Sequence, residues 1–255
     1  MQRKKWNQLE WLEFDLLSEF PKVKHAVFLR HGGCSQGIYA NLNAGLHVGD
    51  HPEHVAANLE RISQQLKREN PHWINYIWGR GVHGKSIASV NSNSPQAIPD
   101  VDGLITNERG LSLMMKHADC QIALFYDPKH HAAANIHAGW RGSVANIYGE
   151  AVQQMRQTFG SNPADLLVCI SPSLGPHEAE FINYRTELPE SFWSFQVRPT
   201  YFDFWAISEH QLKAAGVLPH HIEVARISTY SNASDFFSHR RDKLSGRNAT
   251  CITLL

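Results

Sequence analysis

The chain has 255 residues, 42% of them hydrophobic, and its 24 basic residues balance 24 acidic ones. Such a chain can bury a substantial core, and its zero net charge gives no support to nucleic acid or an anionic membrane as a partner. The four cysteines are dispersed and form no C-x-x-C pair: Cys34, Cys120, Cys169 and Cys251. We therefore expect reduced thiols in a cytoplasmic protein, with no signal peptide at the charge-interrupted N-terminus and no membrane span.

The first predicted elements are an N-terminal segment and one strand. Residues 6–20 are expected to form a cap or short helix, within a cap segment that covers residues 1–22. The run 24–29 is a strand candidate that leads directly into Arg30 and a pair of glycines. Glycines let the backbone approach a ligand closely, so Arg30 is a candidate for holding an anion; the alternative is a surface arginine beside an ordinary turn.

A long helix follows the loop of glycine and asparagine residues at 39–50. Asp50 and Glu53 match a capping box, and Pro52 suits the first helical turn. The apolar residues behind them keep helical spacing: Val55, Leu59, Ile62 and Leu66. This stripe predicts a buried, structural helix face.

Apolar runs predict the strands of the central region: 73–78, 86–90, 111–115, 121–126 and 132–136. His83 lies in a glycine-flanked turn between the first two, where its imidazole would point into a cleft, although a histidine in a turn is more often only exposed. Cys120 precedes the fourth run and His137 follows the fifth, 17 positions later. This spacing lets the chain go up one strand, turn and come back, so the two side chains converge.

After Gly142 the pattern changes to a helical period, and Gly160 ends it. The first turn of that helix carries free N–H groups, and with Arg141 it forms a candidate anion site. The alternative is that Trp140 and Arg141 only pack the helix end. The remaining predicted elements are strands at 166–170, 222–229 and 249–255, a helix at 203–215 and a polar-aromatic loop at 236–242. With no repeat or linker, residues 1–255 are read as one α+β domain with a large mixed sheet system.

One cysteine with two histidines matches the ligand types of zinc. Three protein ligands would leave a fourth position open for water or substrate, as in catalytic sites. Two other interpretations stay open. Cys120 could be a nucleophile with His137 as base and Asp119 as the orienting group, or the three residues could simply be buried in the core.

Several motifs together resemble the YfiH family, which is also labelled polyphenol oxidase or multicopper oxidoreductase laccase and includes the animal purine-metabolism enzyme FAMIN. The motifs are VHG (82–84), DGLIT (102–106), ADC (118–120), HAGWRG (137–142), SLGP (173–176) and FFSHRRD with GR (236–247). The turn after Arg30 and the segment 41–50 match the family's N-terminal signature. The resemblance covers nearly the whole chain, from about residue 25 to its end.

This resemblance implies a single-domain, four-layer α-β-β-α fold, distantly shared with cytotoxic necrotizing factor. It implies a metal, usually zinc, held by His83, Cys120 and His137, with copper possible in vitro. The implied activity is phosphorolysis of adenosine, inosine, guanosine and methylthioadenosine, together with deamination of adenosine. The alternatives are an amidase that edits peptidoglycan precursors and a copper-dependent polyphenol oxidase, as the family label states.

The matched positions supply the remaining site residues. Arg30 and Arg141 are expected to bind phosphate, and Asp119 to carry a proton or orient the site. The expected substrate-binding residues are Asn43, His47 and His117. The expected partners are therefore a purine nucleoside and phosphate, and the chain is expected to be a monomer or small homo-oligomer.

Some positions depart from the family's usual pattern: Gly81, His117, Ser228 and His239 stand where Gln, Thr, Cys and Tyr are common. His117 could line the pocket, tune a neighbour or become a fourth metal ligand. Two motifs of the alternative chemistries are absent. No two of the 16 histidines stand two positions apart, as copper clusters of multicopper oxidases require, and the deaminase pattern H-x-E…P-C-x-x-C is missing.

Overall fold

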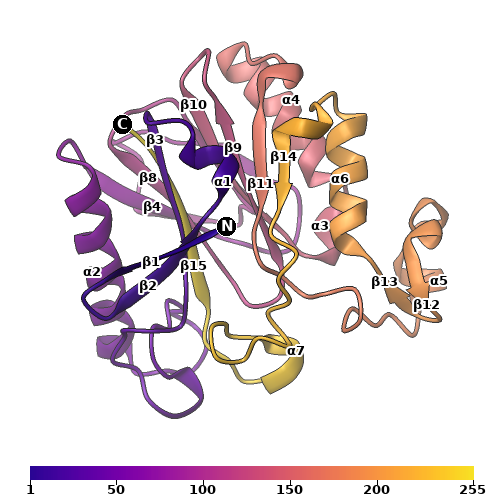
Figure 1. Ribbon diagram of the computed structural model, residues 1–255, viewed down its shortest axis with the longest axis horizontal. Coiled ribbons are helices and arrows are strands. Elements are labelled where there is room, and N and C mark those ends of the chain that lie inside the picture. Colours follow the sequence, from indigo (N-terminus) through magenta and orange to yellow (C-terminus); the bar gives the residue numbers. More distant parts are fainter.

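Two large β-sheets lie face to face in the computed structural model, which describes residues 1–255 (Figure 1). The seven-stranded sheet contains, in spatial order, β1 (Gln2–Trp6), β2 (Leu9–Glu13), β3 (Val23–Phe28), β15 (Asn248–Leu254), β8 (Leu111–His117), β4 (Asn75–Arg80) and β6 (Ala97–Pro99). The six-stranded sheet contains β14 (Ile222–Val224), β11 (Leu167–Ile170), β9 (Gln121–Asp127), β10 (Ala132–Ala138), β7 (Gly103–Thr106) and β5 (Ile87–Ser89). Both sheets are mixed, because β8 is antiparallel to β15 but parallel to β4, and β11 is antiparallel to β9 but parallel to β14.

The central strands are covered on both faces. Every residue of β9, β10 and β15 is buried. A strand in this position needs an uninterrupted apolar run, since neither of its faces meets water. The strands predicted at 121–126, 132–136 and 249–255 are confirmed for this reason.

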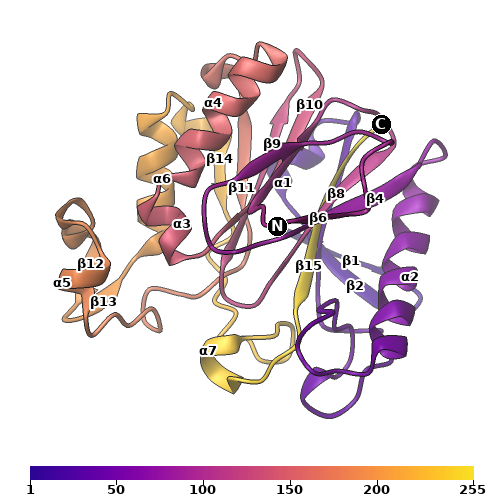
Figure 2. The same ribbon diagram turned by 180° about the vertical axis from the view of Figure 1, so that it is seen from behind.

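Helices cover the outer faces, so the molecule has four layers. On the seven-stranded sheet lies α2 (Pro52–Glu69), whose predicted apolar stripe packs against sheet residues such as Phe28 and Met114. On the six-stranded sheet lie α4 (Ile147–Phe159) and, beside it, α6 (Phe204–Ala214). Figure 2 shows α2 along one side and α4 with α6 along the other, with the sheets between them. A core of 21 buried residues fills the space between the sheets.

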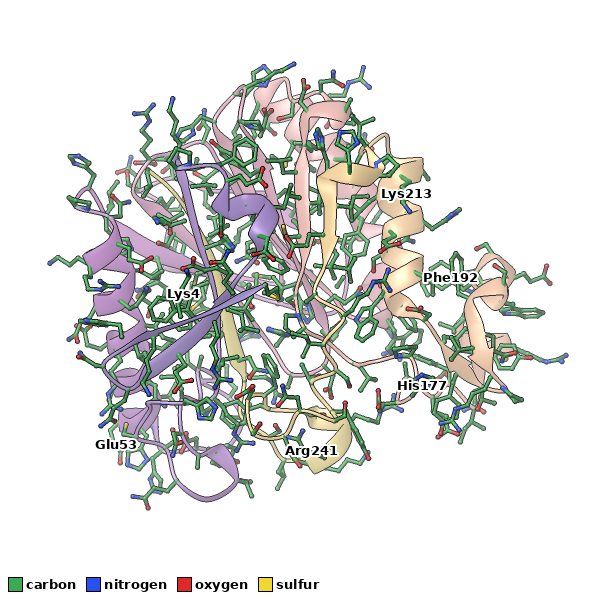
Figure 3. The ribbon with its side chains drawn as sticks, viewed as in Figure 1. Lys4, Glu53, His177, Phe192, Lys213 and Arg241 are labelled. Carbon is green, nitrogen blue, oxygen red and sulfur yellow. The ribbon has the colours of Figure 1, made fainter.

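The shorter elements lie in the connections: α1 (Asp15–Ser18), α3 (Trp140–Val144), α7 (His239–Asp242) and the 3-10 helices η1 (Gly37–Tyr39), η2 (Pro163–Asp165) and η4 (Pro219–His221). One connection forms a projecting arm. It contains α5 (Tyr184–Glu187), η3 (Glu190–Phe195), β12 (Gln196–Arg198) and β13 (Tyr201–Phe202). Figure 3 shows Phe192 on this arm and Arg241 on α7, below the sheets. An aromatic cluster that includes Phe181 and Phe192 attaches the arm to α6.

The helical alternative predicted for residues 6–20 was largely wrong. Most of the N-terminal segment is a β-hairpin at the edge of the seven-stranded sheet, turning at Asn7, which has a φ of 53°. The alternating burial of Leu9 and Trp11 fits a strand that pairs with β3, and this packing overrides the helical interpretation. Only residues 15–18 are helical.

Three other boundaries also differ from the prediction. Asp50 does not cap α2, because its carboxylate accepts hydrogen bonds from Ser35 and Asn43, and the N-cap residue is His51. The helix expected after Gly142 begins earlier, as α3, and is interrupted at Asn146, which has a φ of 55° and caps α4. The strand expected at 222–229 ends at residue 224.

Candidate metal centre

The three predicted metal ligands meet between the two sheets. His83 lies in the turn after β4, Cys120 immediately precedes β9, and His137 lies in β10. Their ligand atoms, one from each side chain, all lie within 4.8 Å of one another. The predicted hairpin explains half of this convergence, since β9 and β10 pair with Ile122 opposite His137. The turn 118–120 explains the rest, because it carries the chain from the seven-stranded to the six-stranded sheet through Asp119, at a φ of 85°.

A fully buried carboxylate, Asp102, holds two of these ligands in place. It accepts a hydrogen bond from Nδ1 of His137 at 2.9 Å. It also accepts backbone N–H bonds from Val82, His83 and Gly84 at 3.1, 3.0 and 2.7 Å. Because Nδ1 of His137 donates to Asp102, Nε2 is left as the metal-binding atom, which is the usual arrangement of a histidine ligand.

Gly81, one of the departures from the family pattern, packs closely against Asp102 and His137. A Cβ atom at Gly81 would lie 2.6 Å from Oδ1 of Asp102 and 3.2 Å from Nδ1 of His137. Burial acts to raise the pKa of the Asp102 carboxyl, but hydrogen bonds from His137 and from the backbone of Gly84 and Val82 hold that pKa below its usual range. Asp102 is therefore a carboxylate near neutral pH.

The electrostatics favour a thiolate at Cys120. Burial acts to raise the pKa of its thiol, but the charge of His137 and hydrogen bonds from His137 and His83 lower it. Burial acts to lower the pKa of His137, and the charge of Cys120 with the bond to Asp102 raises it. Thiolate is the form that binds a metal and also the form that acts as a nucleophile. The donor set of one thiolate and two imidazoles fits zinc.

A first cavity, of about 360 Å³, opens on this group. We call it the aromatic cavity, because its walls include Trp140, Phe181 and Phe204. The other lining residues are His83, Ala118, Asp119, Cys120, Gln121, Ala138, Arg141, Leu174, Ala179, His239 and Arg240. Phe181 and Phe204 reach it from either end of the segment that contains the projecting arm.

A second cavity, of about 410 Å³, touches the same group from the seven-stranded sheet. We call it the cationic cavity, because Arg80, Lys116 and Arg247 lie in its walls, together with His47. The other lining residues are Gly45, Leu46, Val48, Trp78, Gly79, Gly81, His83, Met115, His117, Ala118, Cys120, His137 and His239. The two cavities thus share four residues: His83, Ala118, Cys120 and His239.

Two predicted catalytic residues, Asp119 and Arg141, lie at the aromatic cavity. Both oxygens of Asp119 are occupied: Oδ1 accepts from the Thr229 hydroxyl at 2.7 Å and Oδ2 from the Arg240 backbone at 2.6 Å. Arg141 is exposed, and its guanidinium stacks on the Trp140 ring at 4.0 Å. Asp119 thus ties two loops together, whereas Arg141 keeps its donors open to the cavity.

Arg30 and Asn43 line neither cavity. The guanidinium of Arg30 donates to the carbonyls of Ala40 and Ala233 and lies on the Phe237 ring. The buried amide of Asn43 accepts from the Gly45 and Arg247 backbones and donates to Asp50. The polar atoms of both residues hold loops together.

Three histidines outside the metal group, His47, His117 and His239, have different surroundings. His117 is buried, and its ring nitrogens are bonded to the Cys120 carbonyl at 2.9 Å and the Thr250 hydroxyl at 3.1 Å, so it is not in the ligand group. His47 is exposed in the cationic cavity, and His239 lines both cavities. Ser228 donates to Glu178 and lines neither cavity.

Sequence reasoning missed Asp102, Lys116 and the aromatic walls Phe181 and Phe204. Lys116 had a usable signal, since it is a charged residue between the apolar run 111–115 and His117. Asp102 had a signal as the first residue of the family motif DGLIT, but nothing in the sequence indicated its contact with His137. The two phenylalanines had none, because only the tertiary position of the arm brings them to the site.

Fold and site together define a single-domain α+β protein with a cysteine–histidine group between two mixed sheets that could hold a metal ion. The chain belongs to the family described as multi-copper polyphenol oxidoreductase laccase, whose model matches residues 24–255. It is 34% identical over 248 residues to a purine nucleoside phosphorylase of Bacteroides thetaiotaomicron, covering 90% of each chain. It is 35% identical over 231 residues to the purine nucleoside phosphorylase YlmD of Geobacillus stearothermophilus, covering 84% of this chain and 83% of that one.

Solved structures agree with this assignment. The crystal structure of YlmD from Geobacillus stearothermophilus superposes with a TM-score of 0.86 at 30% identity, covering 98% of this chain and 97% of that one. The crystal structure of a Bacillus licheniformis hypothetical protein, YfiH, superposes with a TM-score of 0.87 at 26% identity, covering 97% of both. None of the helices is long and apolar enough to cross a membrane.

Proposed function

We propose that this chain is a zinc-dependent purine nucleoside phosphorylase acting on adenosine, inosine, guanosine and methylthioadenosine. The observation that carries the proposal is the aromatic cavity, which places three large rings beside the Cys–His group. Its volume lies within the range of small-molecule sites, and flat apolar walls suit a purine base. The names of the curated relatives point to the same activity.

In this proposal His83, Cys120 and His137 hold the zinc ion, and Asp102 orients two of them. When bound, the ion supplies positive charge beside the reacting nucleoside. Its neighbours in this chain recognise and position the substrate. Trp140 and the two phenylalanines stack on the base, and the free guanidinium of Arg141 binds an oxygen of the substrate.

Asp119 acts in this proposal as a positioning residue. Its two hydrogen bonds fix the loops that carry Thr229 and Arg240, and Arg240 in turn donates to the carbonyls of Glu178 and Glu180. These bonds place one wall of the aromatic cavity. Arg30 and Asn43 have a structural role in this proposal, because their polar atoms also hold loops together.

Deamination of adenosine is a second activity that we propose for this site. Exposed His83 and half-buried Cys120 line the aromatic cavity. The accessible side of the Cys–His group therefore faces a purine base that stacks on the aromatic rings of this cavity. Amide hydrolysis of a cell-wall precursor remains the alternative, and it predicts turnover that needs neither phosphate nor a nucleoside. Polyphenol oxidation would require a copper ion at the same three ligands.

The test is incubation of zinc-loaded protein with adenosine, with and without phosphate, resolving adenine, inosine and ribose 1-phosphate. Adenine and ribose 1-phosphate that form only with phosphate establish phosphorolysis, and inosine without phosphate establishes deamination. Cys120→Ala is expected to lose bound zinc and at least ~100-fold in activity, since even residues behind the ligands cost 10–100-fold. Cys34→Ala is the matched control, because Cys34 is also half-buried but lies outside the site. Absence of all three products would overturn the proposal.

A further inference from the structure

The ammonium group of Lys116 has no hydrogen-bond acceptor within the protein. Lys116 lies in β8, and its ammonium group is shielded from solvent yet makes no hydrogen bond. It belongs to no ion pair, and its one close partner is the Trp78 ring, 3.8 Å from Nζ. A buried cation without an acceptor is costly, so a missing acceptor is expected nearby.

The strands open a gap beside this lysine. β4 and β8 pair from Asn75–Leu111 to Trp78–Met114 and no further. Beyond that point β4 continues beside β6, and β8 continues beside β15. The cationic cavity lies where the two strands have separated, with Arg80 on one side and Lys116 on the other.

Outside the metal group, the charged side chains around the gap are all cations. Three of the 17 residues that line the cationic cavity are Lys or Arg, and none is Asp or Glu. Arg247 donates through Nη1 to the carbonyls of Ser245 and Gly246, which leaves Nε and Nη2 without a protein acceptor. Two cations with open donors in a cavity without carboxylates favour a small oxyanion.

We propose that the cationic cavity is the binding site for inorganic phosphate, with Lys116 and Arg247 as its principal ligands. The proposal rests on the proposed function and specifies where its second substrate binds. The two cavities share His83 and Cys120, so phosphate and nucleoside reach the same centre from two sides. An oxygen of hydrogen phosphate forms a bond to C1′ while the C1′–N9 bond breaks. The electron pair stays on the purine, which takes the phosphate proton, and ribose 1-phosphate leaves.

The protonation of Lys116 agrees with this assignment. Burial lowers the pKa of its amine to about 7. A bound phosphate dianion favours the charged form of the Lys116 amine. Phosphate would therefore provide the acceptor that no group of the protein provides.

The test compares phosphate binding and kinetics in zinc-loaded wild type, Lys116→Met and Lys116→Arg. Binding of inorganic phosphate is measured by calorimetry without nucleoside, and KM is measured for each substrate. Lys116→Met is expected to weaken phosphate binding and raise the KM for phosphate by about tenfold or more, with the KM for nucleoside within about twofold. Lys116→Arg retains most of the binding. Lys24→Met is the control, because Lys24 is also half-buried and lies in the same sheet outside the cavity.

The outcomes separate this proposal from the one on which it rests. Unchanged phosphate binding in Lys116→Met, or no phosphate binding in wild type, overturns the phosphate site even if the enzyme phosphorolyses nucleosides. Loss of binding in Lys116→Met while wild type turns over no nucleoside supports the site and rejects the phosphorylase. If Lys116→Met does not fold, Arg247→Gln replaces it with the same expected loss.

Discussion

The two cavities beside the metal group differ in how far their polar groups are satisfied. In the aromatic cavity Asp119, Gln121 and Arg240 make hydrogen bonds within the protein, and Arg141, whose donors are open, is exposed to solvent. In the cationic cavity Lys116 has no acceptor, and Arg247 has two open donors. A satisfied wall presents shape and apolar surface, whereas an unsatisfied one presents charge to a ligand. The difference supports the proposal that the base binds in the first cavity and the anion in the second.

Asp102 holds His83 and His137 of the metal group, which both cavities touch. Its replacement should therefore affect both cavities. We expect Asp102→Asn to lower zinc affinity 10–100-fold, because an amide offers one acceptor oxygen where the carboxylate offers two. Competition with a chromophoric chelator measures this change. Asp127→Asn is the matched control. Asp127 is equally buried and accepts from the Lys129 and His130 backbones and from the His130 ring, far from the metal group.

The two substitutions should cost similar stability but differ in zinc affinity. If Asp127→Asn weakens zinc binding as much as Asp102→Asn does, the effect is one of general stability, and Asp102 has no special role at the metal group.

Replacement of Trp140 should weaken the binding of nucleoside only. Loss of one stacking ring in Trp140→Leu is expected to raise the KM for adenosine about tenfold and leave the KM for phosphate unchanged. Trp193→Leu provides the comparison, since Trp193 packs in the same aromatic cluster but does not line the cavity. Initial-rate kinetics with each substrate varied in turn make the measurement. A parallel rise in both KM values would contradict the division between the cavities.

Replacement of Arg30 should change the binding of neither substrate. Arg30→Lys loses bonds to backbone carbonyls and the contact with Phe237, so we expect a loss of roughly 1–3 kcal/mol in unfolding free energy with both KM values within about twofold. Arg61→Lys should cost less, because Arg61 makes one such bond, to Gly32. Denaturant unfolding measures both variants. A tenfold rise in the KM for phosphate would restore Arg30 as an anion ligand.

The metal group was predictable because short-range geometry determines most of it. A hairpin of two apolar strands places Cys120 near His137 whatever the rest of the fold does, and a glycine-flanked turn exposes His83. The family motifs supplied the same three positions. Uninterrupted apolar runs predicted strands covered on both faces, whereas the four-layer architecture was expected only from the family resemblance.

The remaining features depend on which polar atoms are already occupied. From the sequence Arg30, Asn43 and Lys116 are equally plausible polar residues near the motifs. Only the structure shows that the first two make their hydrogen bonds within the protein and that the third does not. The N-terminal hairpin was missed for a related reason, since pairing with β3 is a long-range contact that local spacing does not reveal.

The bond network of Asp102 has a consequence for metal selectivity. One carboxylate holds the His83 turn from the seven-stranded sheet and the His137 ring from the six-stranded sheet, so the protein's own hydrogen bonds fix two of the three ligands. A thiolate–imidazole donor set of this kind excludes few soft or borderline cations, and intrinsic affinity then follows the order in which copper exceeds zinc. The ion found in purified protein will therefore report the metal supply of the cell or the growth medium. Copper-loaded preparations, and any oxidase activity that they show, carry little information about the native reaction.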